Sequence, residues 1–404
     1  MSMLDLLSSP DTWEAFYRYK TSLICPEAEA EALRAFIDAR VYLPVCEGMA
    51  AGHRFALPRR AVISKMGTQK KRVVYIYPPA ENMVCKLLTW LLLRRYDELF
   101  ADGLYSFRPG RTAKDAVRKF LRTPGIRQQY TYKADIHNYF NSVPVERLLP
   151  AVREAVGEDE RLCTFLCGLL EEPEVLEGGK PIREEKGMMA GTPLSSFYAN
   201  LYLKELDAHF EEAGVPYARY SDDILVFADT REEAEAHAAF IRQFLSERGL
   251  SINPDKETFT APGEPWVFLG FEVAGDRVDI APATVKKLKQ KMRRKARALT
   301  RWAARNGVEP EKAAKAFIRV FNRKLLEGPA AADGAHELTW SRWFFPVITT
   351  TDSLHEIDRY AQECLRYILT GTRTKARYRA RYEDLKALGY RSLVHEYYAF
   401  EKTV

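Results

Sequence analysis

The stretch YARYSDDILVFA (residues 217–228) decides the fold of this 404-residue chain. Strand-forming residues flank a polar tip in which Asp222 and Asp223 are adjacent, and this pattern predicts two paired strands with both carboxylates at their turn. Taken alone, an Asp-Asp pair most often belongs to a surface turn. Here the neighbouring residues are apolar, so two repelling carboxylates would be costly to remove from water unless a cation binds them. Oxygen ligands of this kind suit Mg²⁺.

A second isolated carboxylate has the same setting. Asp135 lies near the end of the strand-like segment YTYKADI (residues 130–136). If this segment neighbours residues 217–228 in one sheet, Asp135 and Asp222 could hold two divalent ions about 4 Å apart. That arrangement serves in-line phosphoryl transfer, in which one ion would activate a primer hydroxyl and the other would hold a triphosphate.

The composition is that of a globular protein with more than one domain. Hydrophobic residues make up 47% and charged residues 29% of the chain, which excludes a mainly disordered or collagenous protein. Short apolar strand segments alternate with helical ones in the middle of the chain, so we expect an α+β fold with an antiparallel sheet. We expect helices over about 145–170 and over 193–212, and a hairpin turn at Gly275–Asp276. The sequence after Pro282 is helical in pattern, so we place a domain boundary near 282.

Basic residues are concentrated in three regions. The net charge is only +6, from 61 basic and 55 acidic residues. Residues 54–72 contain no acid and resemble an exposed hairpin, and residues 283–301 contain nine lysines and arginines without an acid. A second basic stripe covers residues 373–381. These clusters favour a polyanionic partner such as a nucleic-acid backbone, and a solvated basic face is the simpler alternative.

The six cysteines are scattered and form no metal-binding or disulfide pattern. Cys163 and Cys167 are one helical turn apart, and core packing is favoured over a metal site for this pair. The N-terminus lacks the features of a signal peptide, and no window is apolar enough to span a membrane. We therefore expect a cytoplasmic protein in a reducing environment, without a membrane partner.

Seven segments occur in an order that is typical of one family. Together they resemble the consecutive sequence blocks of reverse transcriptases, most closely the bacterial lineage that includes group II intron-encoded enzymes. The resemblance covers about residues 50–275. The segments are RVVYIYPPAENMVCKLL (72–88), YSFRPGRTAKDAV (105–117), KADIHNYFNSV (133–143), AGTPLSSFYANLYL (190–203), YARYSDDILVFA (217–228), LSINPDKETF (250–259) and WVFLGFEV (266–273).

The resemblance implies a right-hand polymerase fold. Residues 1–282 would form the fingers and an antiparallel palm sheet, and residues 283–404 would form an α-helical basic thumb that binds RNA or a duplex. The implied activity is RNA-directed DNA polymerase. Its cofactor would be two Mg²⁺ ions, with Mn²⁺ as an alternative.

The resemblance also implies roles for individual residues. The metal site and catalytic centre would be formed by Asp135, the backbone of Ile136, Asp222 and Asp223. The incoming nucleotide would contact Lys71, Arg72, Arg108, Phe140, Gly191 and Lys256, with help from Lys65 and Lys70. The primer and template would contact Tyr220, Trp266, Leu269 and Gly270. The nucleic-acid backbone would contact Lys286, Lys287, Lys291 and Arg294.

Two of these assignments have further content. Phe140 matches the aromatic steric gate that packs under the sugar and excludes a 2′-hydroxyl, with core packing as its alternative. In the block Ala190-Gly191-Thr192-Pro193-Leu194-Ser195-Ser196, the family usually has Gln-Gly before the proline and Ser-Pro after it. Ala190 replaces a glutamine that touches the nucleotide sugar in typical members, so ordinary sugar selection is in question. Such a variant is similar to the divergent reverse transcriptases of phage-defence systems.

The leading interpretation is therefore a phage-defence enzyme that copies an associated structured noncoding RNA into cDNA from dNTPs. A diversity-generating or domesticated intron reverse transcriptase is an alternative. A maturase-like RNA-binding splicing factor, in which polymerase activity is incidental, is another. The sequence does not predict the oligomeric state.

Overall fold

The computed structural model describes residues 2–402 except 24, 65–70, 327–339 and 373. Contacts divide the chain into two compact units, Met1–Pro262 and Gly263–Val404. The division precedes the boundary expected at 282, because residues 266–280 pack with the C-terminal helices. For example, the Ser353 hydroxyl donates to the Ile280 carbonyl at 3.2 Å. No described helix combines the length and the apolar character that a membrane crossing requires.

The first unit begins with helices that pack on one another through aromatic side chains. Trp13 is fully buried and stacks on Tyr42, with ring centroids 4.7 Å apart. Its indole N–H donates to the Leu7 carbonyl at 2.7 Å, so a large buried ring keeps no unsatisfied polar atom. These elements are η1 (Met3–Ser8), α1 (Pro10–Ser22), α2 (Glu27–Asp38), α3 (Leu43–Ala50) and α4 (Pro79–Arg95).

A four-stranded sheet with the order β2-β1-β4-β5 lies in the same unit. The basic segment forms the hairpin expected from the sequence, with β1 antiparallel to β2 and Ile63 opposite Arg72. The β4–β5 hairpin is not among the expected elements, although its two-residue turn, Gly178-Gly179, with positive φ at both residues, is a strong hairpin signal. The strands are β1 (Arg59–Ser64), β2 (Lys71–Ile76), β4 (Glu174–Glu177) and β5 (Lys180–Arg183).

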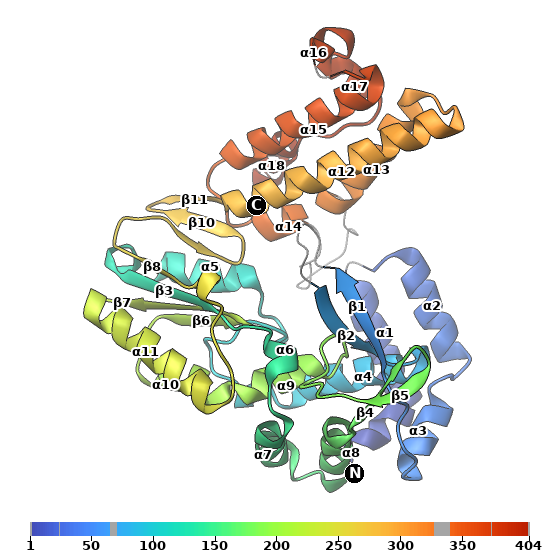
Figure 1. Cartoon of the computed structure of the whole chain (residues 1–404), viewed down its shortest axis with the longest axis vertical. Helices are drawn as coiled ribbons and strands as arrows, with labels where there is room; N and C mark the ends of the chain where they lie inside the picture. Colours follow the sequence, from blue (N-terminus) through green and yellow to red (C-terminus); the bar gives the residue numbers. More distant parts are fainter. Residues whose placement is uncertain (1, 24, 65–70, 327–339, 373, 403–404) are drawn as a thin grey trace. The chain divides into compact units, whose positions relative to one another are not determined.

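The second sheet of this unit has the order β6-β7-β3-β8 and is antiparallel throughout. Helix α11 (Arg231–Glu247) contacts β3 and β7 and runs along the sheet in Figure 1, and Phe120 of α5 (Ala113–Arg122) packs on Phe227 of β7. The strands are β3 (Tyr130–Asp135), β6 (Tyr217–Tyr220), β7 (Asp223–Ala228) and β8 (Thr258–Thr260). The antiparallel sheet predicted from residues 130–136 and 217–228 is confirmed.

Two long helices that the sequence predicts in the first unit are each divided into two. The helix expected over about 145–170 breaks near Gly157, where a Cβ would lie 2.5 Å from the Arg153 carbonyl oxygen. The helix expected over 193–212 is interrupted at Leu203. The helices are α7 (Val145–Val156), α8 (Glu160–Glu171), α9 (Ser195–Tyr202) and α10 (Lys204–Glu212).

The second unit combines a small antiparallel sheet, β11-β10-β9, with helices. The turn expected at Gly275–Asp276 joins β10 to β11, and Gly275 adopts φ +61° as such a turn requires. The strands are β9 (Trp266–Phe268), β10 (Phe271–Ala274) and β11 (Arg277–Ile280). The main helices are α12 (Pro282–Asn306), α13 (Pro310–Leu325), α15 (Asp352–Thr370) and α18 (Leu393–Glu401).

Candidate active site

Three carboxylates from two distant sequence segments meet at one end of the β3–β7 pair. Asp135 ends β3 and lies opposite Asp223, the first residue of β7. The Ile136 N–H donates to the Asp222 carbonyl at 2.9 Å, which extends the pairing by one residue. Ligand atoms of Asp135, Asp222 and Asp223 all lie within 4.8 Å of one another. Within the described part of the chain, this is the single group of three or more acidic, histidine or cysteine residues with such spacing.

Burial makes this cluster electrostatically costly. Removal from water raises the pKa of Asp222, and the Asp135 carboxylate raises it further, while Lys256 and Arg72 act against the shift. Burial likewise raises the pKa of Asp223 to about 6, where Lys133 opposes the shift and the other two aspartates add to it. The cluster therefore favours protons or cations, as expected from its sequence.

Lys256 is the cation nearest to Asp135. It belongs to η4 (Pro254–Lys256), and its ammonium group lies 2.5 Å from Asp135 Oδ2. The Asn253 N–H also donates to the Asp135 carbonyl oxygen at 2.8 Å. The Lys256 side chain is half-exposed, so it can move away from the carboxylate when another cation arrives. The structure thus brings Lys256 to the site where the sequence expects it.

Arg219, three residues before Asp222, forms a buried ion pair with Asp207. Arg219 and Asp207 are both fully buried, and the guanidinium donates to the two carboxylate oxygens at 2.7 and 2.5 Å. The Tyr217 hydroxyl donates to the same carboxylate at 2.9 Å. Arg219 and Asp207 are not among the site residues that the sequence predicts. The available signal was an arginine inside an otherwise apolar strand, two residues before Ser221.

The cations of β2 are exposed near its start. Lys71 and Arg72 begin the strand and form no ion pair with another described residue. The charge of Arg72 is close enough to lower the pKa of Asp222. The positive charge of Arg72 therefore acts on the cluster from a distance, with no hydrogen bond or ion pair between them in the described structure. Lys65 and Lys70 lie outside the described residues.

Phe140 and Gly191 belong to two segments that lie beside β2; next to Phe140, the Asn141 amide donates to the Val73 carbonyl at 3.0 Å. Phe140 is half-buried in α6 (Tyr139–Ser142), with its ring edge-on to Phe107 at 6.5 Å. Gly191 adopts φ +95°, and a Cβ there would lie 3.1 Å from Val74 Cβ and 3.2 Å from the Tyr75 carbonyl oxygen. The backbone of Gly191 therefore approaches β2 more closely than a residue with a side chain could. The preceding residue Ala190 accepts the Tyr75 N–H at 2.8 Å.

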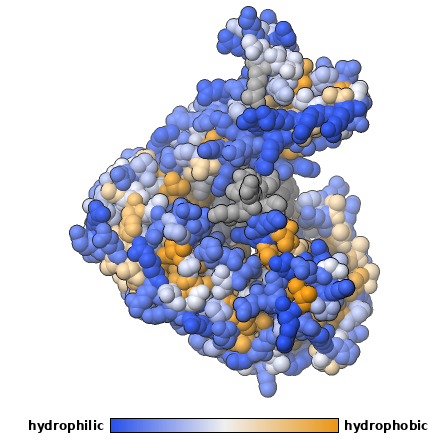
Figure 2. Space-filling view, in the orientation of Figure 1, coloured by the Kyte–Doolittle hydropathy of each residue, from blue (hydrophilic) through white to orange (hydrophobic). Residues whose placement is uncertain are grey.

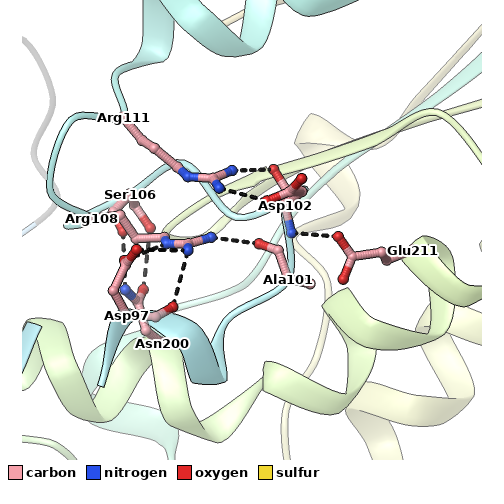
Figure 3. Close-up of polar contacts among 8 residues, drawn as sticks. All are labelled: Asp97, Ala101, Asp102, Ser106, Arg108, Arg111, Asn200 and Glu211. Atoms are coloured by element: carbon pink, nitrogen blue, oxygen red, sulfur yellow. Dashed lines mark hydrogen bonds and ion pairs between the residues drawn. The ribbon is translucent and has the colours of Figure 1, made fainter. Parts of the chain in front are cut away.

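The Arg108 side chain is bound inside the protein, whereas the sequence predicts that it contacts the nucleotide. Its side chain is 3% exposed, and it binds both Asp97 carboxylate oxygens, the Asp97 carbonyl and the Ala101 carbonyl at 2.7–3.0 Å (Figure 3). These bonds leave little of the guanidinium for a nucleotide or template. The geometry favours a structural role for Arg108 as the anchor of its loop.

The remaining predicted contacts with primer, template and nucleic-acid backbone come from both units. Tyr220 pairs with Asp223 at the metal turn. Trp266 is buried in β9 of the second unit, and Leu269 and Gly270 form its turn to β10, both with positive φ. The four predicted backbone-binding residues are exposed on α12, where hydrophilic residues cover the surface in Figure 2. They are Lys286, Lys287, Lys291 and Arg294.

Residues 63–273 match the family model described as reverse transcriptase (RNA-dependent DNA polymerase), and this match spans more than half of the chain. The chain belongs to this reverse transcriptase family. The α+β class and the right-hand polymerase fold expected from the sequence are thereby confirmed.

Two curated relatives support this membership. The uncharacterized 91 kDa protein in the cob intron of Schizosaccharomyces pombe is 27% identical over 159 residues, which are 38% of this chain and 19% of that protein. Retron Ec86 reverse transcriptase of Escherichia coli is 22% identical over 234 residues, which are 57% of this chain and 67% of that enzyme. The chain therefore spans only about a fifth of the first relative.

Solved telomerase structures show a more distant likeness. Apo telomerase from Candida tropicalis, truncated from its C-terminal domain, has a TM-score of 0.46 at 12% identity, over 56% of this chain and 55% of that one. Telomerase from Candida albicans with a TWJ fragment of telomeric RNA has a TM-score of 0.46 at 11% identity, over 87% of this chain and 67% of that one. Likenesses of this size say nothing of activity or partners.

Reverse transcriptases normally use divalent metal ions, and the residues present fit such ions. Asp135, Asp222 and Asp223 offer only carboxylate oxygens, which hard divalent cations prefer. Their clustering in a partly buried position is costly without positive charge. The chemistry of the donors suits Mg²⁺ and Mn²⁺ alike.

The metal-free protein should become less stable as the pH rises through this cluster. Because the folded-state pKa of Asp223 is about 6 and its ordinary value is 3.8, its destabilising effect grows between pH ~4 and ~6 and is complete above ~6. Asp223→Asn should therefore raise the unfolding free energy at pH 8 by on the order of 1–3 kcal/mol. Thermal melting in a chelator at pH 4.5 and pH 8 measures this, and a gain confined to pH 4.5 would contradict it.

Proposed function

We propose that this chain is an RNA-directed DNA polymerase that extends a primer 3′-hydroxyl by transfer of nucleotides from dNTPs. One observation carries the proposal: Asp135 and Asp222, from segments 87 residues apart in sequence, lie together with Asp223 in one partly buried cluster. In the reverse transcriptase family such a cluster is expected to hold two divalent ions. When bound, these ions would activate the hydroxyl and neutralise the triphosphate.

The side chains around the cluster have complementary tasks in this proposal. Asp135, Asp222 and Asp223 fix the cations. Arg72 and Lys71, on the exposed start of β2, bind the triphosphate, where a guanidinium can grip phosphate oxygens in a bidentate manner. Lys256 binds Asp135 in the free protein. After it leaves Asp135, Lys256 would donate a proton to the departing pyrophosphate. Catalysis then depends on positioning and charge neutralisation.

The second unit would act as the thumb. Its longest helix, α12, presents exposed cations on one side and buries Val285, Met292, Ala296 and Ala303 on the other. Cations in a row on a rigid helix suit phosphate contacts that do not depend on sequence. Under this proposal, residues 1–262 hold fingers and palm, and residues 266–280 supply primer contacts from the second unit.

Primer extension tests the proposal directly. The full chain is incubated with a DNA primer on an RNA template, one dNTP at a time, with Mg²⁺ or with a chelator. The proposal predicts incorporation of the complementary dNTP only, and none in the chelator. Failure of the folded protein to extend any primer on RNA or DNA would contradict it.

Phe140→Val should weaken discrimination against ribonucleotides. Shortening the side chain opens space beside the sugar, and the relative use of rNTPs over dNTPs should rise by at least about tenfold. The matched control is Phe259→Val, which changes an exposed phenylalanine of β8. The measurement is kcat/KM for one rNTP and its dNTP. Unchanged selectivity in an active Phe140→Val protein would favour core packing as the role of Phe140.

The biological setting is a separate proposal. We propose an antiviral enzyme that copies a structured noncoding RNA, since Ala190 departs from the usual helix-opening block and one relative is named a retron reverse transcriptase. The other relative is named for its place in an intron, which supports the intron-derived or maturase-like alternatives. Sequencing the nucleic acid that copurifies with the protein separates them. One dominant structured RNA with cDNA supports defence, and intron RNA without cDNA supports a maturase.

We also propose a cytoplasmic location. None of the six cysteines forms a disulfide in the described structure, in keeping with a reducing compartment. Cys167 is buried and Cys163 is half-buried in α8, as expected for core packing.

A further inference from the structure

We propose that Ser106 is a positioning residue for the metal-binding turn and that it works together with Arg219. The two side chains hold the two backbone polar groups of Ser221, the residue before Asp222. This inference rests on the proposed function, because it concerns the site in which Asp222 would bind a divalent ion. In the motif YSFRPGR, sequence analysis pointed to Arg108 and not to Ser106.

The conformation of Ser221 sets the direction of the next residue, Asp222. Its φ of +61° lies in the left-handed region, which a residue with a side chain adopts when its surroundings hold it there. The Ser106 hydroxyl accepts the Ser221 N–H at 2.9 Å. The Arg219 guanidinium donates to the Ser221 carbonyl at 3.2 Å. Both polar groups of the strained residue are therefore bound by buried side chains.

Ser106 is itself oriented by helix α9. It is fully buried, and its hydroxyl donates to Asn200 Oδ1 at 3.3 Å (Figure 3). The Asn200 amide donates back to the Ser106 carbonyl at 3.0 Å. Because the hydroxyl proton is used on Asn200, the oxygen lone pairs are free to accept from Ser221. The buried Asn200 thus fixes the hydroxyl as an acceptor.

The loop that carries Ser106 is attached to β6 like an additional strand. The Tyr105 N–H donates to the Arg219 carbonyl at 3.0 Å, and the Arg219 N–H donates to the Gly103 carbonyl at 2.8 Å. A Cβ on Gly103 would lie 2.7 Å from Tyr217 Cδ1, so the loop approaches β6 more closely than another residue would allow. At the end of the loop, the Arg108 side chain binds Asp97 and the Ala101 carbonyl (Figure 3). The Ser106 hydroxyl therefore has a fixed place beside the turn.

Loss of this hydroxyl should affect the metal site more than the fold. In Ser106→Ala, the buried Ser221 N–H has no acceptor, and the turn can leave the conformation that directs Asp222 toward Asp135. The Arg219–Asp207 pair remains in place. Substitution of a residue that orients a metal ligand without touching the metal typically lowers the metal affinity about 10–100-fold. We expect Ser106→Ala to weaken Mn²⁺ binding by this factor.

The experiment measures Mn²⁺ binding to the full chain without primer or nucleotide, from the electron paramagnetic resonance signal of free Mn²⁺. The matched control is Thr89→Val, which deletes another buried hydroxyl of the first unit, one that donates to the Cys85 carbonyl at 2.7 Å. Thr89→Val should keep wild-type affinity. In single-nucleotide incorporation, Ser106→Ala should raise the apparent KM for Mg²⁺ and keep most of kcat at saturating metal.

Unchanged Mn²⁺ affinity in folded Ser106→Ala would overturn the positioning role. So would an equal loss in Thr89→Val, because it would indicate general loosening of the unit. A loss specific to Ser106→Ala supports the role even if no protein incorporates nucleotides, in which case the proposed polymerase function fails alone. An active wild type whose Mg²⁺ dependence is unchanged by Ser106→Ala would leave the polymerase standing and remove the positioning role.

Discussion

Asp222→Asn should lower the rate of nucleotide incorporation by at least about 10³-fold, since the loss of a single charge-stabilising group already costs about 10²–10³. Asparagine keeps the size of the side chain and removes the negative charge that a divalent ion needs. Asp135→Asn should have a similar effect, because both carboxylates belong to the same cluster. Single-turnover incorporation of one dNTP on an RNA template measures the rate.

The fold should survive these substitutions, because each relieves repulsion among buried carboxylates. The matched control is Asp229→Asn, directly after the other end of β7, where the exposed carboxylate accepts a bond from the Gln129 side chain. The incorporation rate of this variant should equal that of wild type. Circular dichroism checks folding in all variants. Wild-type incorporation by folded Asp222→Asn would contradict the assignment of the cluster.

Asp207→Asn should destabilise the first unit by about 3–5 kcal/mol, the usual cost of removing one partner of a buried ion pair. The substitution leaves the fully buried Arg219 guanidinium without a counter-charge. It also removes the carboxylate that accepts from Tyr217. Urea unfolding, monitored by hydrogen exchange in peptides from residues 217–228, measures the stability of the first unit separately from that of the second.

Two controls separate the buried ion pair from surface effects. Glu205 lies on α10, the helix of Asp207, and its 60% exposed side chain pairs with Arg248. Glu205→Gln removes this surface pair and should lower the unfolding free energy by less than about 1 kcal/mol. The double variant Asp207→Leu with Arg219→Met removes both charges and should recover much of the lost stability. Equal effects of Asp207→Asn and Glu205→Gln would contradict the importance of this buried pair.

The centre of the fold could be predicted from sequence because its signals are local. The runs around Asp135 and Asp222 alternate with turns and contain strand-forming residues, and each carboxylate sits at the end of its strand. Antiparallel pairing of these two segments then places the ends together, as β3 and β7 do. The same reasoning located the β1–β2 hairpin and the β10–β11 turn.

The support of the site could not be predicted in this way. The Ser221 N–H donates to Ser106, and the Ser221 carbonyl accepts from Arg219, but the polar character of these residues would equally suit a solvated loop. Arg108 illustrates the same limit of a sequence pattern, since an arginine in a family motif predicts a nucleotide contact, whereas the buried side chain binds Asp97 in the structure. Which partner a polar side chain finds depends on tertiary packing, and no pattern of spacing carries that information.

The divided helices and the unit boundary have a similar origin. Gly157 and Leu203 interrupt stretches whose apolar periodicity continues across the break. The sheet of residues 266–280 joins the second unit through contacts with residues far along the chain, such as the bond from the Thr349 N–H to the Val278 carbonyl at 2.8 Å. The sequence becomes rich in basic residues only after residue 282. This change therefore marks the start of α12 and not the boundary between the two units.

The central claim is that Asp135, Asp222 and Asp223 hold the divalent ions of template-directed nucleotide transfer. Its most direct test counts Mn²⁺ bound to the full chain in complex with an RNA template, a chain-terminated DNA primer and the next dNTP. The account predicts two bound ions in the wild type and their loss in the double variant Asp135→Asn with Asp222→Asn. Absence of bound ions in the wild-type complex, or their retention in the double variant, would contradict it.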